Sequence, residues 1–123
     1  MLALKVVLVK HDAIATLVFD EVDQGIGGEV GVQVADALAD VAQRHQVLVI
    51  THLPQIAARA DTHLAVSKEA RRGLATSDVQ LLHGEDRIQE IARMLGDAEG
   101  ETARRHAQAM LRRELVGTRN SSR

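Results

Sequence analysis

The sequence predicts an α/β fold in which parallel strands are flanked by helices, with a small β-hairpin in the second half. Two short, largely apolar runs, Ala15–Phe19 and Val47–Ile50, have the length and composition of buried strands. Between them, Glu29–Arg44 repeats its apolar residues with helical spacing. This order of strand, helix and strand implies a right-handed crossover between parallel strands. Because neither strand alternates polar and apolar residues, we expect both faces of the sheet to be covered.

The first elements follow from apolar spacing and glycine content. Met1–Lys10 is predicted to be a short buried helix with Leu4 and Leu8 inward, too short to span a membrane. A chain that begins in a buried helix is expected to be a piece of a longer protein. Asp20–Gly28 is predicted to be a loop, because three of its last four residues are glycines. The helix Glu29–Arg44 places on one face Val30, Val34, Leu38 and Val41.

The middle of the chain is predicted to form a short helix and a hairpin. Leu53–Ala60 is the helix, and Pro54 is tolerated in its first turn. His63–Ser67 and Ser77–Leu82 are predicted to be short strands. The charged segment Lys68–Ala75, which contains a glycine, is expected to be the loop that joins them.

Two helices are predicted to complete the fold. Arg87–Leu95 is amphipathic and is ended by Gly96, and Glu101–Leu115 is the last helix. No linker divides the chain. We therefore expect residues 1–116 to form one lobe and residues 117–123, which are mostly small, polar or basic, to form a disordered tail.

The composition limits the function classes. The 123 residues include one Phe and no Tyr or Trp, so the core is aliphatic and stacking on nucleic-acid bases is not expected. The net charge of −2 gives no global basic field for DNA. Three arginine pairs, at 71–72, 104–105 and 112–113, can contact phosphates but are better interpreted as solvated helix faces. Without cysteine there is no disulfide or thiolate chemistry.

Polar residues follow both apolar strands at the point where each strand ends. Asp20 and Glu21 follow the first run, and Thr51 and His52 follow the second. Ligands of open α/β sheets bind beyond the carboxyl ends of parallel strands, so neighbouring strands would bring these residues to one edge. There Asp20 can hold Mg²⁺ bound to phosphate oxygens, and Glu21 can activate a water that attacks a γ-phosphate. His52 can donate a hydrogen bond to that phosphate.

The glycine-rich loop after the two acids is the second part of the candidate site. Asp23, Gly25, Gly27 and Gly28 are expected to bind the nucleotide and to contact a partner subunit across it. Each feature also has a plainer interpretation. Strands that face solvent often end in acids, a histidine there can be a surface residue, and the glycines can simply form a tight turn.

Four stretches together resemble the C-terminal ATPase lobe of the RecN family, bacterial DNA repair proteins related to the SMC and ABC ATPases. The most specific motifs are Leu-Val-Phe-Asp-Glu-Val-Asp, Gly-Ile-Gly-Gly and Val-Ile-Thr-His-Leu-Pro-Gln. The resemblance covers nearly the whole chain and is carried by Met1–Lys10, Thr16–Gly28, His45–Asp61 and Arg87–Gly96.

The resemblance implies a partial P-loop NTPase lobe of the ABC/SMC head type. Asp20 would be the Walker B magnesium ligand, Glu21 the catalytic base, residues 23–28 the D-loop and His52 the switch histidine. ATP and Mg²⁺ would be the cofactors of the complete head. Its partners would be the missing N-terminal half, a second head in a homodimer and DNA through the full-length parent. The location would be cytoplasmic and nucleoid-associated, with no membrane partner.

The sequence departs from the family pattern in three ways. It lacks the P-loop G-x-x-x-x-G-K-S/T, the Ser-Gly-Gly signature and sustained coiled-coil heptads. The backbone amides and the lysine of a P-loop hold the β- and γ-phosphates, so carboxylates alone would bind nucleotide poorly. We therefore expect a fragment of an ATPase that is inactive alone.

Three other interpretations compete with this one. The chain can be a non-catalytic docking module that pairs with another ATPase lobe through Met1–Val9. It can be a dinucleotide-binding turn, although Gly25 and Gly27 would then require glycine where Val30 stands. The third, a histidine metal site, is set aside because the spacing of the histidines fits no zinc motif. The histidines compared for this spacing are five of the six in the chain, His45, His52, His63, His83 and His106.

Overall fold

The computed structural model describes residues 15–120, which form two compact units. The first unit ends at Arg59 and the second begins at Ala60. This division was not predicted, because no change in composition marks it in the sequence. The helix predicted for residues 1–10 lies outside the described residues. Within the described part of the chain, no helix has the length and apolar character needed to cross a membrane.

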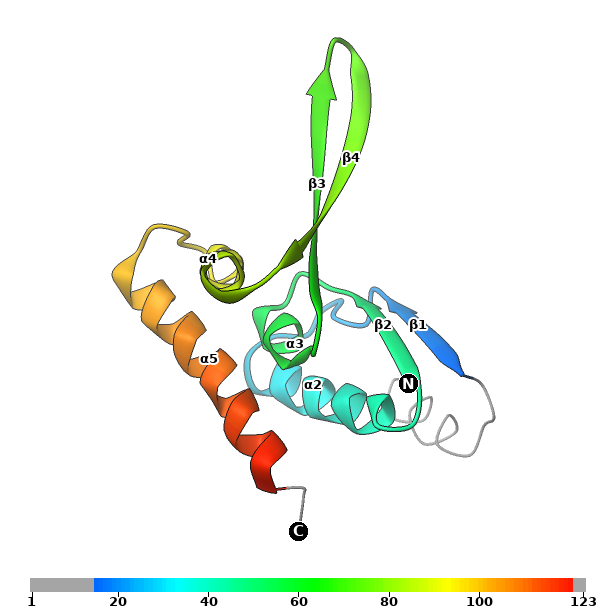
Figure 1. Ribbon diagram of the computed structural model, residues 1–123, viewed down its shortest axis with the longest axis vertical. Coiled ribbons are helices and arrows are strands. Elements are labelled where there is room, and N and C mark those ends of the chain that lie inside the picture. The colour runs from blue at the N-terminus through cyan, green and yellow to red at the C-terminus, as the bar shows by residue number, and fades with distance from the viewer. Residues whose placement is uncertain (1–14, 121–123) are drawn as a thin grey trace. The chain divides into compact units, whose positions relative to one another are not determined.

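The first unit combines a two-stranded parallel sheet with two helices (Figure 1). The strands Thr16–Asp20 (β1) and Gln46–Ile50 (β2) pair in parallel, with Thr16 opposite Gln46 and Asp20 opposite Ile50, which confirms the predicted strand–helix–strand unit. Glu29 lies in the first turn of the intervening helix, where a carboxylate interacts favourably with the helix dipole. The elements are β1 (Thr16–Asp20), α2 (Gly28–Ala42), β2 (Gln46–Ile50) and α3 (Pro54–Arg59).

The core of the first unit lies between one face of the sheet and the two helices. Phe19 of β1 is buried together with Ala35 and Leu38 of α2 and Ile56 of α3. Burial of such a large apolar side chain contributes about 1.5–3 kcal/mol. The core therefore fixes β1 against both helices, and with it the position of the residues that follow Phe19.

The opposite face of the sheet is uncovered. Val18, Leu48 and Ile50 expose 65%, 47% and 60% of their surface. The expectation that both faces are covered is therefore wrong for the described residues. Strands without polar alternation are typical of sheets buried on both sides, so this face is an apolar surface without a cover in the described part of the chain.

The second unit consists of a long hairpin and two helices (Figure 1). The prediction of a loop over Lys68–Ala75 is wrong in its extent, because both strands continue to a two-residue turn at Arg72 and Gly73. Arg72 has φ 52° and Gly73 has φ 77°, and two positive φ angles are typical of the type I′ turns that suit the twist of a hairpin. The elements are β3 (His63–Arg71), β4 (Leu74–Leu82), α4 (Gly84–Met94) and α5 (Glu101–Asn120).

The helices α4 and α5 pack on each other at the base of the hairpin. Ile91 and Ala107 are fully buried, and Arg104 of α5 forms an ion pair with Glu85 of α4. The helix α4 begins earlier than predicted, at Gly84. α5 continues past its predicted end and includes residues 117–120, the first part of the segment expected to be disordered.

Candidate functional site

The carboxyl ends of β1 and β2 lie at the same edge of the parallel sheet. Asp20 is the last residue of β1 and lies opposite Ile50, and Thr51 and His52 follow directly. Parallel pairing therefore brings the two predicted strand-end groups together, as the sequence led us to expect. Asp20, Glu21 and His52 are exposed at this edge, and the His52 side chain is 79% exposed.

Glu21 adopts a backbone conformation that is unusual for its residue type. Its φ of 57° lies in the left-handed region, which costs a non-glycine residue about 1–2 kcal/mol. The turn that follows is closed by a hydrogen bond of 3.3 Å from the Gln24 amide to the Glu21 carbonyl. Strained residues concentrate at functional sites, so this backbone conformation is a reason to consider Glu21 a candidate functional residue.

Asp23 joins the two strand ends through one carboxylate oxygen. Asp23 is only 2% exposed, and its Oδ2 accepts a hydrogen bond of 2.6 Å from the Thr51 hydroxyl and one of 2.8 Å from the His52 amide. The Nδ1 atom of His52 lies 3.2 Å from the same oxygen. The Thr51 hydroxyl in turn accepts a hydrogen bond of 3.0 Å from the Leu53 amide. The loop after β1 is therefore fastened to the residues after β2.

The hydrogen bonds of Asp23 keep its carboxylate charged in a buried position. Burial by itself raises the pKa of the Asp23 carboxyl, because it disfavours the charged form. The Thr51 hydroxyl, the backbone amides of His52 and Asp23, and the nearby His52 charge lower it. The lowering effects prevail, so the pKa of Asp23 lies below its ordinary value.

The glycines of the loop leave its backbone open to solvent. Gly25 has φ 69° and Gly28 has φ 56°, so both positions favour glycine. Gly27 is extended and serves as the N-cap of α2. Among the described residues, a Cβ atom at any of these three positions would meet no atom within 4 Å beyond its own chain neighbours. The space above this backbone is therefore free for a nucleotide or a partner chain to approach.

The donor groups at this edge fit magnesium bound together with a phosphate. Among the described residues, no group of three or more His, Cys, Asp or Glu side chains can hold a metal ion. Magnesium is commonly held by one or two carboxylates, with waters and substrate phosphates as its other ligands. The exposed Asp20 carboxylate at the strand end has this character, whereas a metal site built from protein ligands alone is not present in the described residues.

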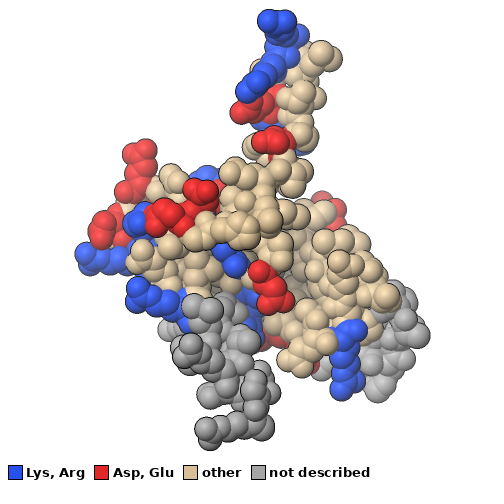
Figure 2. Space-filling model, viewed as in Figure 1, with Lys and Arg blue, Asp and Glu red and all other residues tan. Residues whose placement is uncertain are grey.

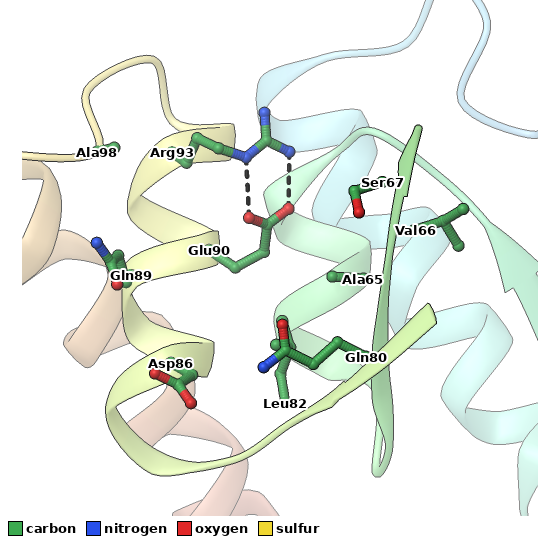
Figure 3. Close-up of a pocket in the computed structure, with 10 residues that line it drawn as sticks. All are labelled: Ala65, Val66, Ser67, Gln80, Leu82, Asp86, Gln89, Glu90, Arg93 and Ala98. Atoms are coloured by element: carbon green, nitrogen blue, oxygen red, sulfur yellow. Dashed lines mark hydrogen bonds and ion pairs between the residues drawn. The ribbon is translucent and has the colours of Figure 1, made fainter. Parts of the chain in front are cut away.

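A separate hollow of about 570 Å³ lies in the second unit between the hairpin and α4 (Figure 3). Its most conspicuous charges are Glu90 and Arg93, which bind each other through two hydrogen bonds of 2.8 and 2.7 Å. The hydrogen bond and the charge of Arg93 lower the pKa of Glu90. Glu90 and Arg93 therefore satisfy each other, and Asp86 is a further acidic residue that lines the hollow.

The arginine pairs at 71–72 and 104–105 are exposed to solvent, but only the second pair lies on a helix. Arg71 and Arg72 are at the far end of the hairpin, where Figure 2 shows a concentration of basic side chains, so their predicted helical placement is wrong. Arg71 is 3.1 Å from Glu69. On α5, Arg104 and Arg105 are paired with glutamates. The pairing reduces the positive charge available for phosphates.

The sequence did not reveal the part that Thr51 plays. Thr51 follows the second strand directly, but its contact with Asp23 spans 28 residues and depends on the pairing of β1 with β2. The roles of the predicted catalytic, magnesium-binding and nucleotide-binding residues stay predictions.

The chain is similar to RecN proteins over most of its length. It is 52% identical over 112 residues to the DNA repair protein RecN of Mycobacterium leprae, and 46% identical over 112 residues to that of Streptomyces coelicolor. Each match covers 90% of this chain. RecN of Deinococcus radiodurans is 50% identical over 96 residues, or 78% of this chain. The chain spans about a fifth of the length of these relatives, from 17% to 20%. No family model matches it.

A solved structure shares the fold. It comes from a study of ATP-driven dimerization and DNA-stimulated activation of SMC ATPases, and it covers 78% of this chain and 57% of its own. The TM-score is 0.62 and the identity is 23%. The matched part of this chain therefore has the same fold as that structure.

Proposed function

We propose that this chain, a RecN-type member of the SMC/ABC ATPase family, supplies the hydrolytic edge of an ATPase head that acts in DNA double-strand-break repair. The observation that carries the proposal is the parallel pairing of β1 and β2. That pairing gives Asp20 and His52 one common edge. In this proposal the chain is part of a P-loop NTPase lobe whose phosphate-binding loop lies in another segment of the parent.

Each residue of the edge has a distinct role in this proposal. Asp20 is the Walker B ligand of Mg²⁺, and Glu21 orients and deprotonates the attacking water. His52 is the switch histidine that contacts the γ-phosphate. Mg²⁺ neutralises charge on the phosphates when it is bound. The open backbone at Gly25, Gly27 and Gly28, with Asp23, forms the D-loop, and it lies beside the nucleotide of a second head.

The partners follow from the parts that this chain lacks. The rest of the parent supplies the P-loop and the signature motif, and a second head completes the ATP sandwich. DNA is bound by the full-length parent, and the protein is cytoplasmic and associated with the nucleoid. The isolated chain is inactive in this proposal, because it has no amide cradle for the β- and γ-phosphates.

A second candidate function is a docking module without catalysis. It is favoured by the uncovered apolar face formed by Val18, Leu48 and Ile50. Large exposed apolar patches usually mark interaction sites. In this alternative the chain binds another ATPase lobe through this face and contributes no group to ATP hydrolysis.

ATP hydrolysis by a reconstituted head tests the proposal. The chain is assayed alone and after mixing with a separately expressed segment of the parent that carries the P-loop. We expect hydrolysis only in the mixture. Glu21→Gln should lower its rate by about 10²–10⁴-fold, since a positioned general base contributes that much. ATP binding should persist, because glutamine keeps the shape of the side chain.

The matched control is Glu29→Gln, which removes the same charge from an exposed glutamate in the first turn of α2. This variant should hydrolyse ATP normally. Full activity of the Glu21→Gln mixture would exclude Glu21 as the base. A stable complex that hydrolyses no ATP would favour the docking module.

A further inference from the structure

The carboxylate of Asp23 makes its contacts inside the chain rather than toward the free space above the loop. It is almost fully buried, and three atoms of Thr51 and His52 surround its Oδ2 at 2.6 to 3.2 Å. A side chain placed in this way has little surface left for a nucleotide or for a second subunit. Its contacts instead fix the backbone and the ring of His52.

From this geometry we propose that Asp23 is a positioning residue that sets the tautomer and the orientation of the His52 ring. The Nδ1 atom lies 3.2 Å from the Asp23 carboxylate. A lone pair on Nδ1 would repel a carboxylate oxygen at this distance, whereas a proton on Nδ1 is attracted to it. The Asp23 carboxylate therefore selects the ring with a proton on Nδ1.

The consequence for His52 is a defined atom at the open edge of the sheet. With Nδ1 facing Asp23, Nε2 is the nitrogen left for a phosphate. In the neutral ring this Nε2 is an acceptor, and it donates a hydrogen bond only when the ring is doubly protonated. The contacts of Asp23 thus give an exposed histidine one ring orientation and one neutral tautomer.

Thr51 completes the arrangement by holding the carboxylate in place. Its hydroxyl donates to Asp23 Oδ2 and accepts from the Leu53 amide, so it has one orientation. The His52 amide also donates to Asp23, which fixes the backbone from which the ring extends. The role of this arrangement in phosphate contact rests on the proposed function, whereas the tautomer of His52 does not.

The first test is a measurement of the His52 tautomer by ¹H–¹⁵N correlation NMR. The chain is labelled with ¹⁵N-histidine, and the His52 resonances are identified by their absence in His52→Gln. We expect the neutral ring to carry its proton on Nδ1. In Asp23→Asn the resonances should shift toward the tautomer mixture of a free imidazole. Asp36→Asn, an exposed aspartate of α2, is the matched control and should leave them unchanged.

A second pair of variants covers the case in which Asp23→Asn does not fold. Thr51→Val removes the hydroxyl and keeps the shape, so it should shift the His52 resonances in the same direction. Thr51→Ser keeps the hydroxyl and should restore the original spectrum. A proton on Nε2 in the unsubstituted chain, or identical spectra for Thr51→Val and Thr51→Ser, would overturn the proposal.

The kinetic test separates positioning from direct nucleotide binding. In the reconstituted head, Asp23→Asn should lower kcat by about tenfold or more, because loss of a carboxylate that orients a histidine has a large effect on turnover. KM for ATP should stay within about twofold. A raised KM with unchanged kcat would show that Asp23 binds nucleotide instead. If the head hydrolyses no ATP at all, the proposed function fails while the NMR result stands by itself.

Discussion

At the residue scale, a buried Asp23 carboxylate remains favourable because hydrogen-bond donors replace the water that it loses. Two neutral donors, the Thr51 hydroxyl and the His52 amide, lie within 2.8 Å of one oxygen. Hydrogen bonds to a charged group contribute about 1.5–3 kcal/mol each, whereas an unpaired buried charge is strongly unfavourable. Removal of Thr51 or of Asp23 alone would therefore leave a buried polar group without its partner.

His63, at the start of β3, predicts a pH dependence of stability. Burial lowers the pKa of the His63 imidazole, and the positive charge of Arg87 lowers it further, against an opposing effect of Glu90. The unfolded chain, in which the pKa is about 6.5, then binds a proton that the folded chain does not. The contribution of neutral His63 to the free energy of unfolding is fully present above about pH 6.5. It is lost as the pH falls toward the pKa of His63 in the folded chain.

We expect His63→Gln to flatten the dependence of the unfolding free energy on pH below about 6.5. Binding of one proton changes the unfolding free energy by at most about 1.4 kcal/mol per pH unit. Urea unfolding at a series of pH values measures this slope. The control is His106→Gln, because His106 is exposed on α5. Equal slopes for the His63 variant and the unsubstituted chain would contradict the prediction.

The candidate site was only partly predictable at this scale. Asp20, Glu21 and His52 could be found because each follows an apolar run, and a strand end is recognisable in a sequence. The contact of Asp23 with Thr51 could not be found, because it needs the register of β1 against β2. A buried aspartate in a glycine-rich loop looks the same in the sequence as an exposed one.

At the scale of elements, the hairpin shows where apolar patterning fails. Nearly all side chains of β3 and β4 are exposed. Because the charged part of the strands has no buried face, its polar and apolar residues do not alternate. The segment Lys68–Ala75 therefore had the composition of a loop. The parallel strands could be predicted because each is a short apolar run, and α2 could be predicted because its apolar residues repeat with helical spacing.

The type I′ turn of the hairpin predicts that two substitutions of Arg72 have opposite effects on the stability of the hairpin. Arg72 has φ 52°, which asparagine tolerates and a β-branched residue does not. Arg72→Asn creates the favoured Asn-Gly pair and should stabilise the hairpin by a few tenths of a kcal/mol. Arg72→Val should destabilise it by about 1 kcal/mol or more.

Both variants remove the same charge, so the comparison isolates the backbone effect. Hydrogen exchange of the β3 and β4 amides measures the local opening free energy of the hairpin. Asn should slow the exchange, and Val should accelerate it. If the two substitutions changed exchange equally, the turn would not depend on the positive φ of residue 72.

At the scale of the whole molecule, the sheet of the first unit has one packed face and one face that no described residue covers. Phe19 faces the helices, whereas Val18, Leu48 and Ile50 face outward. The relatives are about five times as long as this chain, because the matched segment is 19% to 20% of their length. We therefore expect the outward face to be covered by the P-loop segment of the parent in the proposed head.

Leu48→Ser tests this expectation through the affinity between the chain and that segment. Burial of a leucine side chain contributes about 1.5–3 kcal/mol, so its loss should raise Kd by about 10- to 100-fold. Calorimetric titration of the two pieces measures Kd. The matched control is Val32→Ser on α2, because Val32 is 48% exposed and Leu48 is 47% exposed.

The control distinguishes a specific binding surface from non-specific hydrophobic association. Val32→Ser should leave Kd within about twofold, since a surface side chain outside an interface contributes little to binding. Thermal unfolding of both variants checks that each chain is folded before titration. Equal weakening by the two substitutions would mean that the outward face of β2 is not the surface on which the parent docks. A loss of affinity confined to Leu48→Ser would mean that the P-loop segment binds the exposed sheet face, in the same head that contains the hydrolytic edge.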